Sequence, residues 1–264
     1  MRPRQFANTW LLDFHKIIKG STRGKEENVS ENEDWGRRAQ KGFLASGIDP
    51  GDRRGHKNDY IDLLQKTALE EVLDLKGDEI VLDFGCGSGR MSYWIAPRVK
   101  RVLGLEVTSE MIDLAELNRA SENVEFRLYD GAHFPVFPDP FDLILSVGVL
   151  LTMRGEALQR TVSQLAFTLK REGKMVLIEQ ASDHPKVGRP RVGEYLDAFK
   201  GSGMACLRHY PIRRGRWWLL YLIRYGIIPR AFFPRISKNE LRGLRSKKGP
   251  ISYYRDYLFY LAKI

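Results

Sequence analysis

Residues 81–89 read Val-Leu-Asp-Phe-Gly-Cys-Gly-Ser-Gly, an apolar strand pattern that runs into a loop with a glycine at every second position. A helical pattern follows directly from Arg90. Because glycine has no Cβ, such a loop turns tightly and lets a ligand lie against its backbone. The free N–H groups at the start of the next helix point toward the same place. The segment therefore predicts the ligand-binding turn of a Rossmann-like α/β fold.

Apolar segments alternate with helical patterns beyond this loop. Strands are expected at 80–84, 101–106, 124–128, 141–147 and 174–179, and helices at 90–96, 109–120 and 156–170. A further helix is expected at 191–200, with late strands at 205–210 and 254–262. Strands separated by helices indicate parallel βαβ units with right-handed crossovers, and hence an α/β fold with helices on both faces of the sheet.

Two segments lie outside this alternation. Residues 1–58 are expected to form an N-terminal helical and irregular extension, which includes an apolar stripe of Phe6, Trp10, Phe14 and Ile17. Residues 59–264 form the main domain, which opens with a helix at 59–76 that Gly77 ends. Within it, residues 211–252 are longer than a connection between two strands requires, and we expect them to be a lid insertion.

The spacing of the loop separates two classes of cofactor. A dinucleotide fingerprint reads G-x-G-x-x-G, whereas this loop reads D-x-G-x-G-x-G from Asp83. Glu106 ends the next strand, where a carboxylate can accept hydrogen bonds from both hydroxyls of a ribose. Asp130 ends the third strand, where an acidic side chain can accept from an adenine amino group.

The segments DFGCGSG, GLEVTSEM and YDGAHFPVFPDPFDLIL resemble the class I S-adenosylmethionine-dependent methyltransferases, and the resemblance covers about residues 60–180. It implies a seven-stranded, mostly parallel sheet with an antiparallel last strand, and S-adenosyl-L-methionine as the cofactor. It places Glu106 at the ribose. Around the methionine moiety it places Asp83, Gly85, Gly87 and Gly89, and near the adenine Val107, Met111, Asp130 and Gly131. The expected cofactor-binding residues are Asp83, Gly85, Cys86, Gly87, Gly89, Glu106, Val107, Met111, Asp130, Gly131 and Ser146.

Several acceptor classes are excluded by the motifs that the sequence lacks. The strand end at 146–149, Ser-Val-Gly-Val, is not the Asp/Asn-Pro-Pro-aromatic loop of enzymes that methylate exocyclic base amines. The sequence has no Pro-Cys for attack on cytosine C5, and no Asp-Asn pair for the magnesium of catechol-type enzymes. We therefore predict transfer to a hydroxyl or amine of a small molecule, a lipid or a glycan, lipid-linked or free.

Three residues are candidates for the base that such an acceptor requires. His184 follows the fifth strand at the carboxyl edge of the sheet, where ligands bind in open α/β folds. Glu179 ends that strand, and His133 lies in the loop before the fourth. No metal site is expected, since the two cysteines, Cys86 and Cys206, are far apart in the sequence.

The net charge of +10 is concentrated in residues 186–264, which hold 18 Lys/Arg against 4 Asp/Glu. Such a field attracts phosphorylated substrates, nucleic acid or anionic lipid. A nucleic-acid-directed methyltransferase that uses this basic third is therefore one alternative function. An NAD(P)-binding oxidoreductase is another, although it would favour G-x-G-x-x-G.

Localisation is expected to be cytoplasmic, with a peripheral contact on an anionic membrane as a further hypothesis. No apolar run reaches the ~20 residues that span a bilayer. Residues 213–235 combine arginines with aromatic side chains, Trp217, Trp218, Tyr221 and Tyr225 among them. This segment either roofs the acceptor pocket as the core of a lid or lies on a membrane surface. The oligomeric state stays open.

Overall fold

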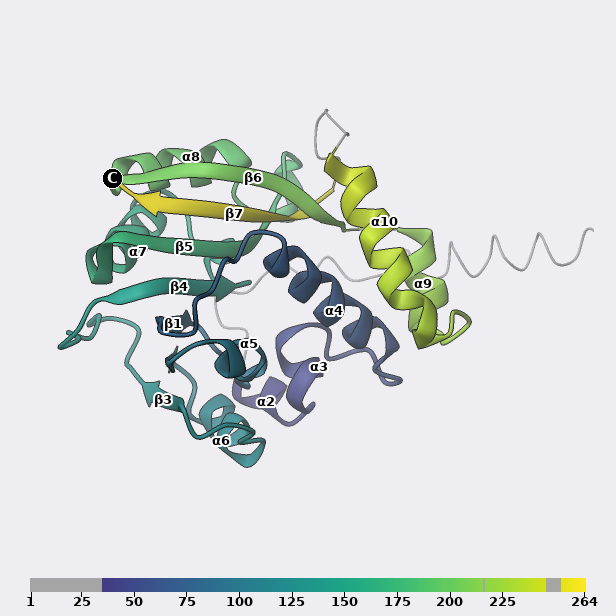
Figure 1. Cartoon of the computed structure of the whole chain (residues 1–264). Helices are drawn as coiled ribbons and strands as arrows, with labels where there is room; N and C mark the ends of the chain where they lie inside the picture. The colour runs from purple at the N-terminus through teal and green to yellow at the C-terminus, as the bar shows by residue number, and fades with distance from the viewer. Residues whose placement is uncertain (1–34, 216, 246–252) are drawn as a thin grey trace, which may run out of the picture. The chain divides into compact units, whose positions relative to one another are not determined.

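The structure, a computed structural model, describes residues 35–215, 217–245 and 253–264, all of which belong to the compact unit Asp34–Ile264. The apolar stripe expected within residues 5–18 lies outside the described residues. A seven-stranded sheet with the order β3-β2-β1-β4-β5-β7-β6 forms the centre of this unit (Figure 1). The strands are β1 Ile80–Phe84, β2 Arg101–Glu106, β3 Val124–Leu128, β4 Phe141–Val147, β5 Leu169–Ala181, β6 Met204–Arg214 and β7 Arg255–Lys263.

The strand directions confirm the predicted fold class. Strands β1 to β5 pair in parallel, while β7 lies between β5 and β6 and runs antiparallel to both. The last strand in the sequence is thus the antiparallel one, as expected.

Helices cover both faces of the sheet, which was also expected. On one face, α4, α5, α9 and α10 share a core cluster with β1 and β5, and on the other α7 and α8 share a second cluster. The helices are α2 Trp35–Ala39, α3 Phe43–Gly47, α4 His56–Glu70, α5 Arg90–Ile95, α6 Ser109–Leu117, α7 Gly155–Thr168, α8 Val192–Gly201, α9 Trp218–Arg224 and α10 Phe233–Arg245. In the described part of the chain, no helix is both long enough and apolar enough to span a membrane.

Alternation along β5 explains the two clusters. Val176 and Ile178 point into the α4 side, while Met175 and Leu177 point into the α7 and α8 side. All four are buried, as expected for a central strand whose two faces are both covered by helices.

Three element boundaries differ from the sequence-based expectation by about four residues or more. Helix α4 ends at Glu70 rather than near residue 76. Before β1 the backbone N–H groups of Lys76 and Gly77 donate to the carboxylate of Glu79 and form a turn. Strand β5 begins at Leu169, directly after α7, so residues 171–173, which lie between the expected helix and the expected strand, are part of the strand.

Strand β6 continues to Arg214, and residues 211–214 therefore belong to the sheet rather than to an insertion. The extension is held by Arg213, whose guanidinium donates to both carboxylate oxygens of Asp256 on β7, at 2.6 and 2.9 Å. Both side chains are buried. Such a pair, separated by 43 positions, leaves no local signal in the sequence.

Candidate functional site

The glycine-rich loop after β1 is fastened to the end of β2. The backbone N–H groups of Gly85 and Cys86 donate to the carbonyl of Leu105, and that of Gly87 donates to Glu106 Oε2 at 2.9 Å. The loop and the predicted ribose-binding carboxylate are therefore one hydrogen-bonded unit at the carboxyl edge of the sheet. This is the edge at which ligands bind in open α/β folds.

Glu106 is held in place by its own strand end. Its Oε1 accepts from the backbone N–H groups of Val107 at 2.8 Å and Thr108 at 3.1 Å, and the residue is buried. A carboxylate oxygen has two acceptor sites, so three backbone bonds leave Glu106 one further site, on Oε2, for a ligand hydroxyl. The structure thus fixes the position of the side chain, and its contact with a ribose stays a prediction.

Two glycines of the loop serve different purposes. A Cβ on Gly85 would lie 2.3 Å from Val149 Cγ2, so the absence of a side chain lets the loop after β4 pack against the cofactor loop. A Cβ on Gly87 would meet nothing within 4 Å. Both have positive φ, which favours glycine. Gly87 therefore faces open space where a ligand can lie against the backbone.

Asp83 lies beneath the loop and is buried. It accepts a 2.5 Å hydrogen bond from Ser92 Oγ at the start of α5. Burial raises its pKa to about 6, with Ser92 and Arg90 acting in the opposite direction. The side chain of Arg90 is held by Asp62 at 3.0 Å and Gln65 at 2.7 Å, so α4 and α5 both support the loop.

A contact that sequence reasoning missed covers the loop from the N-terminal side. Ser88 Oγ donates to the carbonyl of Phe43 at 2.6 Å, and the Phe43 ring stacks with Tyr93 at 6.5 Å. Helix α3, within a segment expected to be largely irregular, therefore packs on the cofactor loop. The two partners are 45 positions apart, and neither has a recognisable motif.

The loop after β3 brings the predicted adenine-binding residues together. A Cβ on Gly131 would lie 3.5 Å from Val107 Cγ1, so the ends of β2 and β3 meet. Asp130 accepts from the backbone N–H groups of Ala132 and His133, and it pairs with His133 Nδ1 at 2.6 Å. These bonds lower the pKa of Asp130 to about 2. Its contact with adenine stays a prediction, open to the remaining acceptor site of Oδ2.

Three other predicted residues are enclosed. Met111 is a buried residue of α6, and Cys86 is buried with a pKa raised by that burial. Ser146 is buried at the end of β4, and its Oγ has no hydrogen-bond partner among the described residues. Gly89 begins α5, and its N–H donates to the carbonyl of Cys86 at 3.0 Å.

Of the three candidate bases, Glu179 is the one built into the interior. It is buried at the end of β5, and its Oε1 accepts from the N–H groups of Val149 at 3.1 Å and Leu150 at 3.0 Å. Burial raises its pKa to about 8. Its Oε2 has no partner in the described part of the chain. Through Val149, which packs against Gly85, the carboxyl adjoins the cofactor loop.

The other two candidate bases, His184 and His133, lie on the surface. His184 is exposed after β5, and its Nδ1 accepts the N–H of Lys186 at 3.2 Å, which assigns the proton of the neutral ring to Nε2. Its basic nitrogen is therefore occupied. His133 is exposed, and the hydrogen bond with Asp130 raises its pKa. The three candidates thus sit on three different loops or strand ends.

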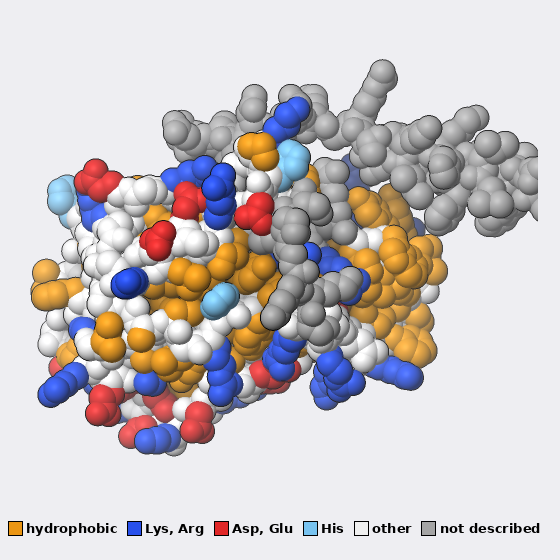
Figure 2. Space-filling view, turned by 90° about the horizontal axis from the view of Figure 1, so that it is seen from above, with side chains coloured by type: hydrophobic (Ala, Val, Ile, Leu, Met, Phe, Trp, Pro, Cys, Tyr) orange, Lys and Arg blue, Asp and Glu red, His pale blue; other side chains and the backbone are white. Residues whose placement is uncertain are grey.

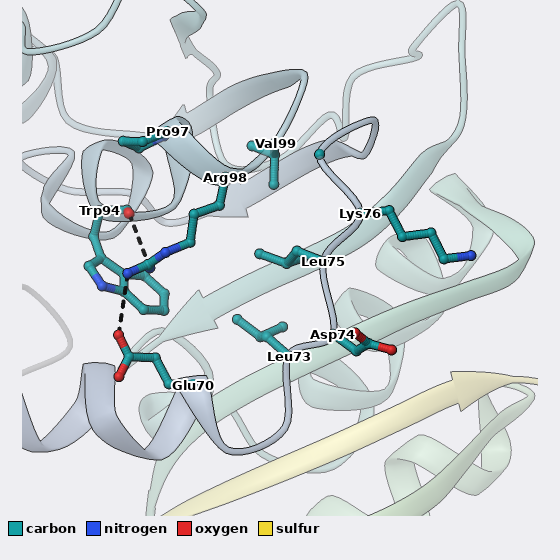
Figure 3. Close-up of a pocket in the computed structure, with 10 residues that line it drawn as sticks. Glu70, Leu73, Asp74, Leu75, Lys76, Trp94, Pro97, Arg98 and Val99 are labelled. Carbon is teal, nitrogen blue, oxygen red and sulfur yellow. Dashed lines mark hydrogen bonds and ion pairs between the residues drawn. The ribbon is translucent and has the colours of Figure 1, made fainter.

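A groove of about 650 Å³ lies at the opposite edge of the sheet. Its walls come from the end of α4, the turn before β1 and the segment that precedes β2, with Trp94, Arg98 and Glu70 joined on one side (Figure 3). The amino ends of the strands lie here, whereas the glycine loop and Glu106 lie at the carboxyl ends. The groove is therefore separate from the site described above.

Comparison with known proteins supports the assignment of the fold and of a methyltransferase domain. The family described as "Methyltransferase domain" matches residues 81–173. The chain is 27% identical over 143 residues to the uncharacterized methyltransferase YcgJ of Bacillus subtilis, covering 51% of this chain and 50% of that protein. It is 42% identical over 64 residues to an uncharacterized RNA methyltransferase of Clostridium tetani, covering 24% and 14%. The chain thus spans half or less of the length of these relatives.

A solved structure shares the fold over most of the chain. Geranyl diphosphate C-methyltransferase of Streptomyces coelicolor, bound to S-adenosyl-L-homocysteine, superposes with a TM-score of 0.58 at 17% identity, covering 84% of this chain and 88% of that one. The matched family region contains the glycine loop, Glu106 and Asp130, and the sheet has the strand order described above. Residues 81–173 therefore match a methyltransferase domain, and the chain shares its fold with S-adenosylmethionine-dependent methyltransferases.

Proposed function

We propose that this chain transfers a methyl group from S-adenosyl-L-methionine to a hydroxyl or amine of a small molecule, a lipid or a lipid-linked glycan. The observation that carries the proposal is the bond between Gly87 N–H and Glu106, which joins an open glycine turn to an oriented carboxylate. The residues fit the cofactor because the Cβ position of Gly87 is empty and Glu106 keeps acceptor capacity.

The cofactor supplies a methyl group on a positively charged sulfur, which an acceptor atom attacks in line. The chain accelerates such a reaction by holding acceptor and methyl group in line and by excluding water. The predicted cofactor contacts along 83–89 and at Glu106 provide the orientation. Helix α3 provides part of the cover through the bond from Ser88 to Phe43.

Within this proposal Glu179 is the base that takes a proton from the acceptor. A pKa of about 8 is close to the working range of a general base, and Oε2 is available because only Oε1 binds the backbone. His184 is less suited because the N–H of Lys186 occupies its Nδ1. Glu179 would remove the proton as the acceptor–methyl bond forms.

Nucleic acid is a weaker candidate for the acceptor. The match to the Clostridium tetani RNA methyltransferase spans only 64 residues, which is 24% of this chain. Methylation at a pyrimidine carbon requires a nucleophile such as a thiolate. Burial raises the pKa of both Cys86 and Cys206, and Cys206 lies on the edge strand β6. Neither thiol is placed for that role.

An oxidoreductase that binds NAD(P) is disfavoured by the topology. A dinucleotide-binding sheet has the strand order 3-2-1-4-5-6. Here β7 is inserted antiparallel between β5 and β6. The loop spacing, D-x-G-x-G-x-G, also differs from the dinucleotide fingerprint.

The test measures binding by calorimetry and then transfer. S-adenosylhomocysteine should bind and NADH should not, and Glu106→Ala should weaken S-adenosylhomocysteine binding about 10- to 100-fold, since charged hydrogen bonds contribute roughly 1.5–3 kcal/mol. Glu110→Ala, an exposed carboxylate on α6, is the control that should bind as the unmodified chain does. Preferential binding of NADH would overturn the proposal.

For the acceptor, transfer of tritium from labelled S-adenosylmethionine is followed into lipid, glycan, small-molecule, protein and nucleic-acid fractions of a cell extract. Label in one of the first three fractions supports the proposed acceptor class. Label confined to nucleic acid would overturn that class while leaving methyl transfer itself intact.

A further inference from the structure

Helix α9 has one buried and one exposed side. Leu220 and Ile223 are buried in the core cluster shared with α4. Trp218, Tyr221 and Tyr225 follow one another at spacings of three and four, which places them on one side of the helix. These three are exposed by 68%, 45% and 56%. One side of α9 therefore packs into the core, and the other side lies on the surface.

The exposed side continues past the helix. Ile227 and Phe232 are exposed by 63% and 53% in the connection between α9 and α10. The aromatic face is defined as Trp218, Tyr221, Tyr225, Ile227 and Phe232. Figure 2 shows hydrophobic side chains gathered at the end of the unit where α9 and α10 lie, with Lys and Arg side chains at the margin. Large apolar side chains gathered on a surface in this way mark a site of interaction.

Helix α10 is divided in the same manner, but its outer side is basic. Phe233, Leu241 and Leu244 are buried. The basic face is defined as Arg235, Lys238 and Arg242, which are exposed at spacings of three and four on the opposite side. Within the described part of the chain, no hydrogen bond or ion pair engages any of these three cations. They are available to an anionic partner.

The two faces are carried by a fixed platform. Helices α9 and α10 both pack against α4, and Phe233 meets Tyr60 of α4 edge-on at 5.5 Å. The connection between them is anchored separately, since Arg224 binds Gly51 and Asp49 while Arg230 binds Asp59 at 2.6 Å. These two arginines are engaged within the chain, unlike those of the basic face.

We propose that the aromatic face and the basic face together dock this protein on a bilayer surface rich in anionic lipid. Tryptophan and tyrosine favour the boundary between headgroups and hydrocarbon, because each has an apolar body and a polar tip. The exposed cations of the basic face are attracted to the negative charge of an anionic leaflet. Ile227 has no ring to stack on a nucleobase, so a lipid surface accounts for the whole aromatic face better than single-stranded nucleic acid does.

The test is sedimentation of the full chain with vesicles. We expect pelleting with mixed phosphatidylglycerol and phosphatidylcholine at low salt, much less at high salt, and little with phosphatidylcholine alone. Arg235→Glu/Lys238→Glu/Arg242→Glu should lower the partition coefficient about a hundredfold or more. The matched control, Lys100→Glu/Arg101→Glu/Arg171→Glu, changes the charge equally at the amino ends of the strands and should lower it far less.

Trp218→Ser/Tyr221→Ser/Tyr225→Ser should also abolish pelleting, whereas Phe167→Ser, an exposed ring on α7, should not. Calorimetry with S-adenosylhomocysteine shows that each variant is folded, so the outcome is independent of the acceptor. Absence of pelleting at low salt would overturn the inference. So would equal loss in the control variants, or binding of the unmodified chain to single-stranded RNA in place of vesicles.

Discussion

The two carboxylate oxygens of Glu179 have different surroundings. Its Oε1 is committed to the loop after β4, while Oε2 has no partner in the described part of the chain. The same burial that raises the pKa to about 8 also gives the residue an effect on stability. Two pH-dependent measurements therefore report on one carboxyl group.

Folding stability should fall as pH rises from about 4.5 to about 8. In the unfolded chain Glu179 loses its proton near its ordinary pKa of 4.5, whereas in the folded chain it keeps the proton up to about 8. The folded state then binds more protons over this range, so raising the pH favours unfolding. Urea denaturation at several pH values should show a flatter dependence for Glu179→Gln than for the unmodified chain. Identical slopes would mean that the group titrates normally.

Activity should show the opposite trend. As the base, Glu179 must be ionised, so kcat/KM is expected to rise with pH and level off above about 8. Glu179→Gln should lose most activity and this pH dependence while it still binds S-adenosylhomocysteine. A variant with full activity would reduce Glu179 to a structural anchor of the loop after β4.

Substitutions at Gly85 and Gly87 should have different consequences. In Gly85→Ala the new methyl group would lie 2.3 Å from Val149 Cγ2, and together with the positive φ this should destabilise the fold by about 2–4 kcal/mol. In Gly87→Ala the methyl group meets no protein atom, so the chain should lose only about 1–2 kcal/mol but bind the cofactor at least tenfold more weakly. Thermal unfolding and calorimetry distinguish the two, and equal affinities would place the cofactor elsewhere.

At the scale of elements, α10 is attached to α4 and β6 by a buried carboxylate. Glu240 accepts from Tyr60 Oη at 2.6 Å and from the N–H of Arg214 at 2.9 Å. Burial raises the pKa of Glu240 and also that of Tyr60. One residue thus joins three elements that are far apart in the sequence.

Tyr60→Phe should reveal the strength of this attachment. The ring can keep its contact with Phe233, but one carboxylate oxygen of Glu240 loses its partner, which should cost roughly 1–3 kcal/mol in urea denaturation. Affinity for S-adenosylhomocysteine should stay unchanged. Tyr221→Phe, with an exposed ring on α9, is the control and should have no measurable effect. Equal stability of the two variants would show that the bond to Glu240 contributes nothing.

At the scale of the whole unit, two cores are separated by one sheet. Ile178 belongs to the cluster with α4, and its sequence neighbour Leu177 to the cluster with α7 and α8. Leu258 of β7 pairs directly with Ile178 and shares its cluster. The effects of two substitutions on the free energy of unfolding should therefore be non-additive within one core and additive across the sheet.

Double-mutant cycles test this arrangement. Ile178→Val and Leu177→Ala should destabilise additively to within about 0.5 kcal/mol, because their side chains lie on opposite faces. Ile178→Val and Leu258→Ala should deviate from additivity by about 0.5–3 kcal/mol, because they are cross-strand neighbours. Coupling across the sheet as large as coupling within one core would contradict a two-core unit.

The sequence by itself determined the glycine-rich turn after β1, most of the strands and the position of Glu106 at the end of β2. Each depends on a local pattern: glycines two positions apart, or an apolar run of strand length between helices. The same reasoning ended β6 too early, because pairing with β7 extends it through 211–214. It also began β5 at 174, although Leu169 already pairs with Phe141 and a register irregularity separates the two paired parts.

Only the tertiary structure decided which groups surround that loop and which side of α9 is exposed. Helix α3 on Ser88, Val149 against Gly85 and Arg213 with Asp256 are contacts between residues at least 43 positions apart. Periodicity shows that a helix has an apolar side, but the position of α4 determines that Ile223 is buried and Trp218 is not. Such contacts depend on how elements pack, and packing is a property of the folded chain rather than of any one segment.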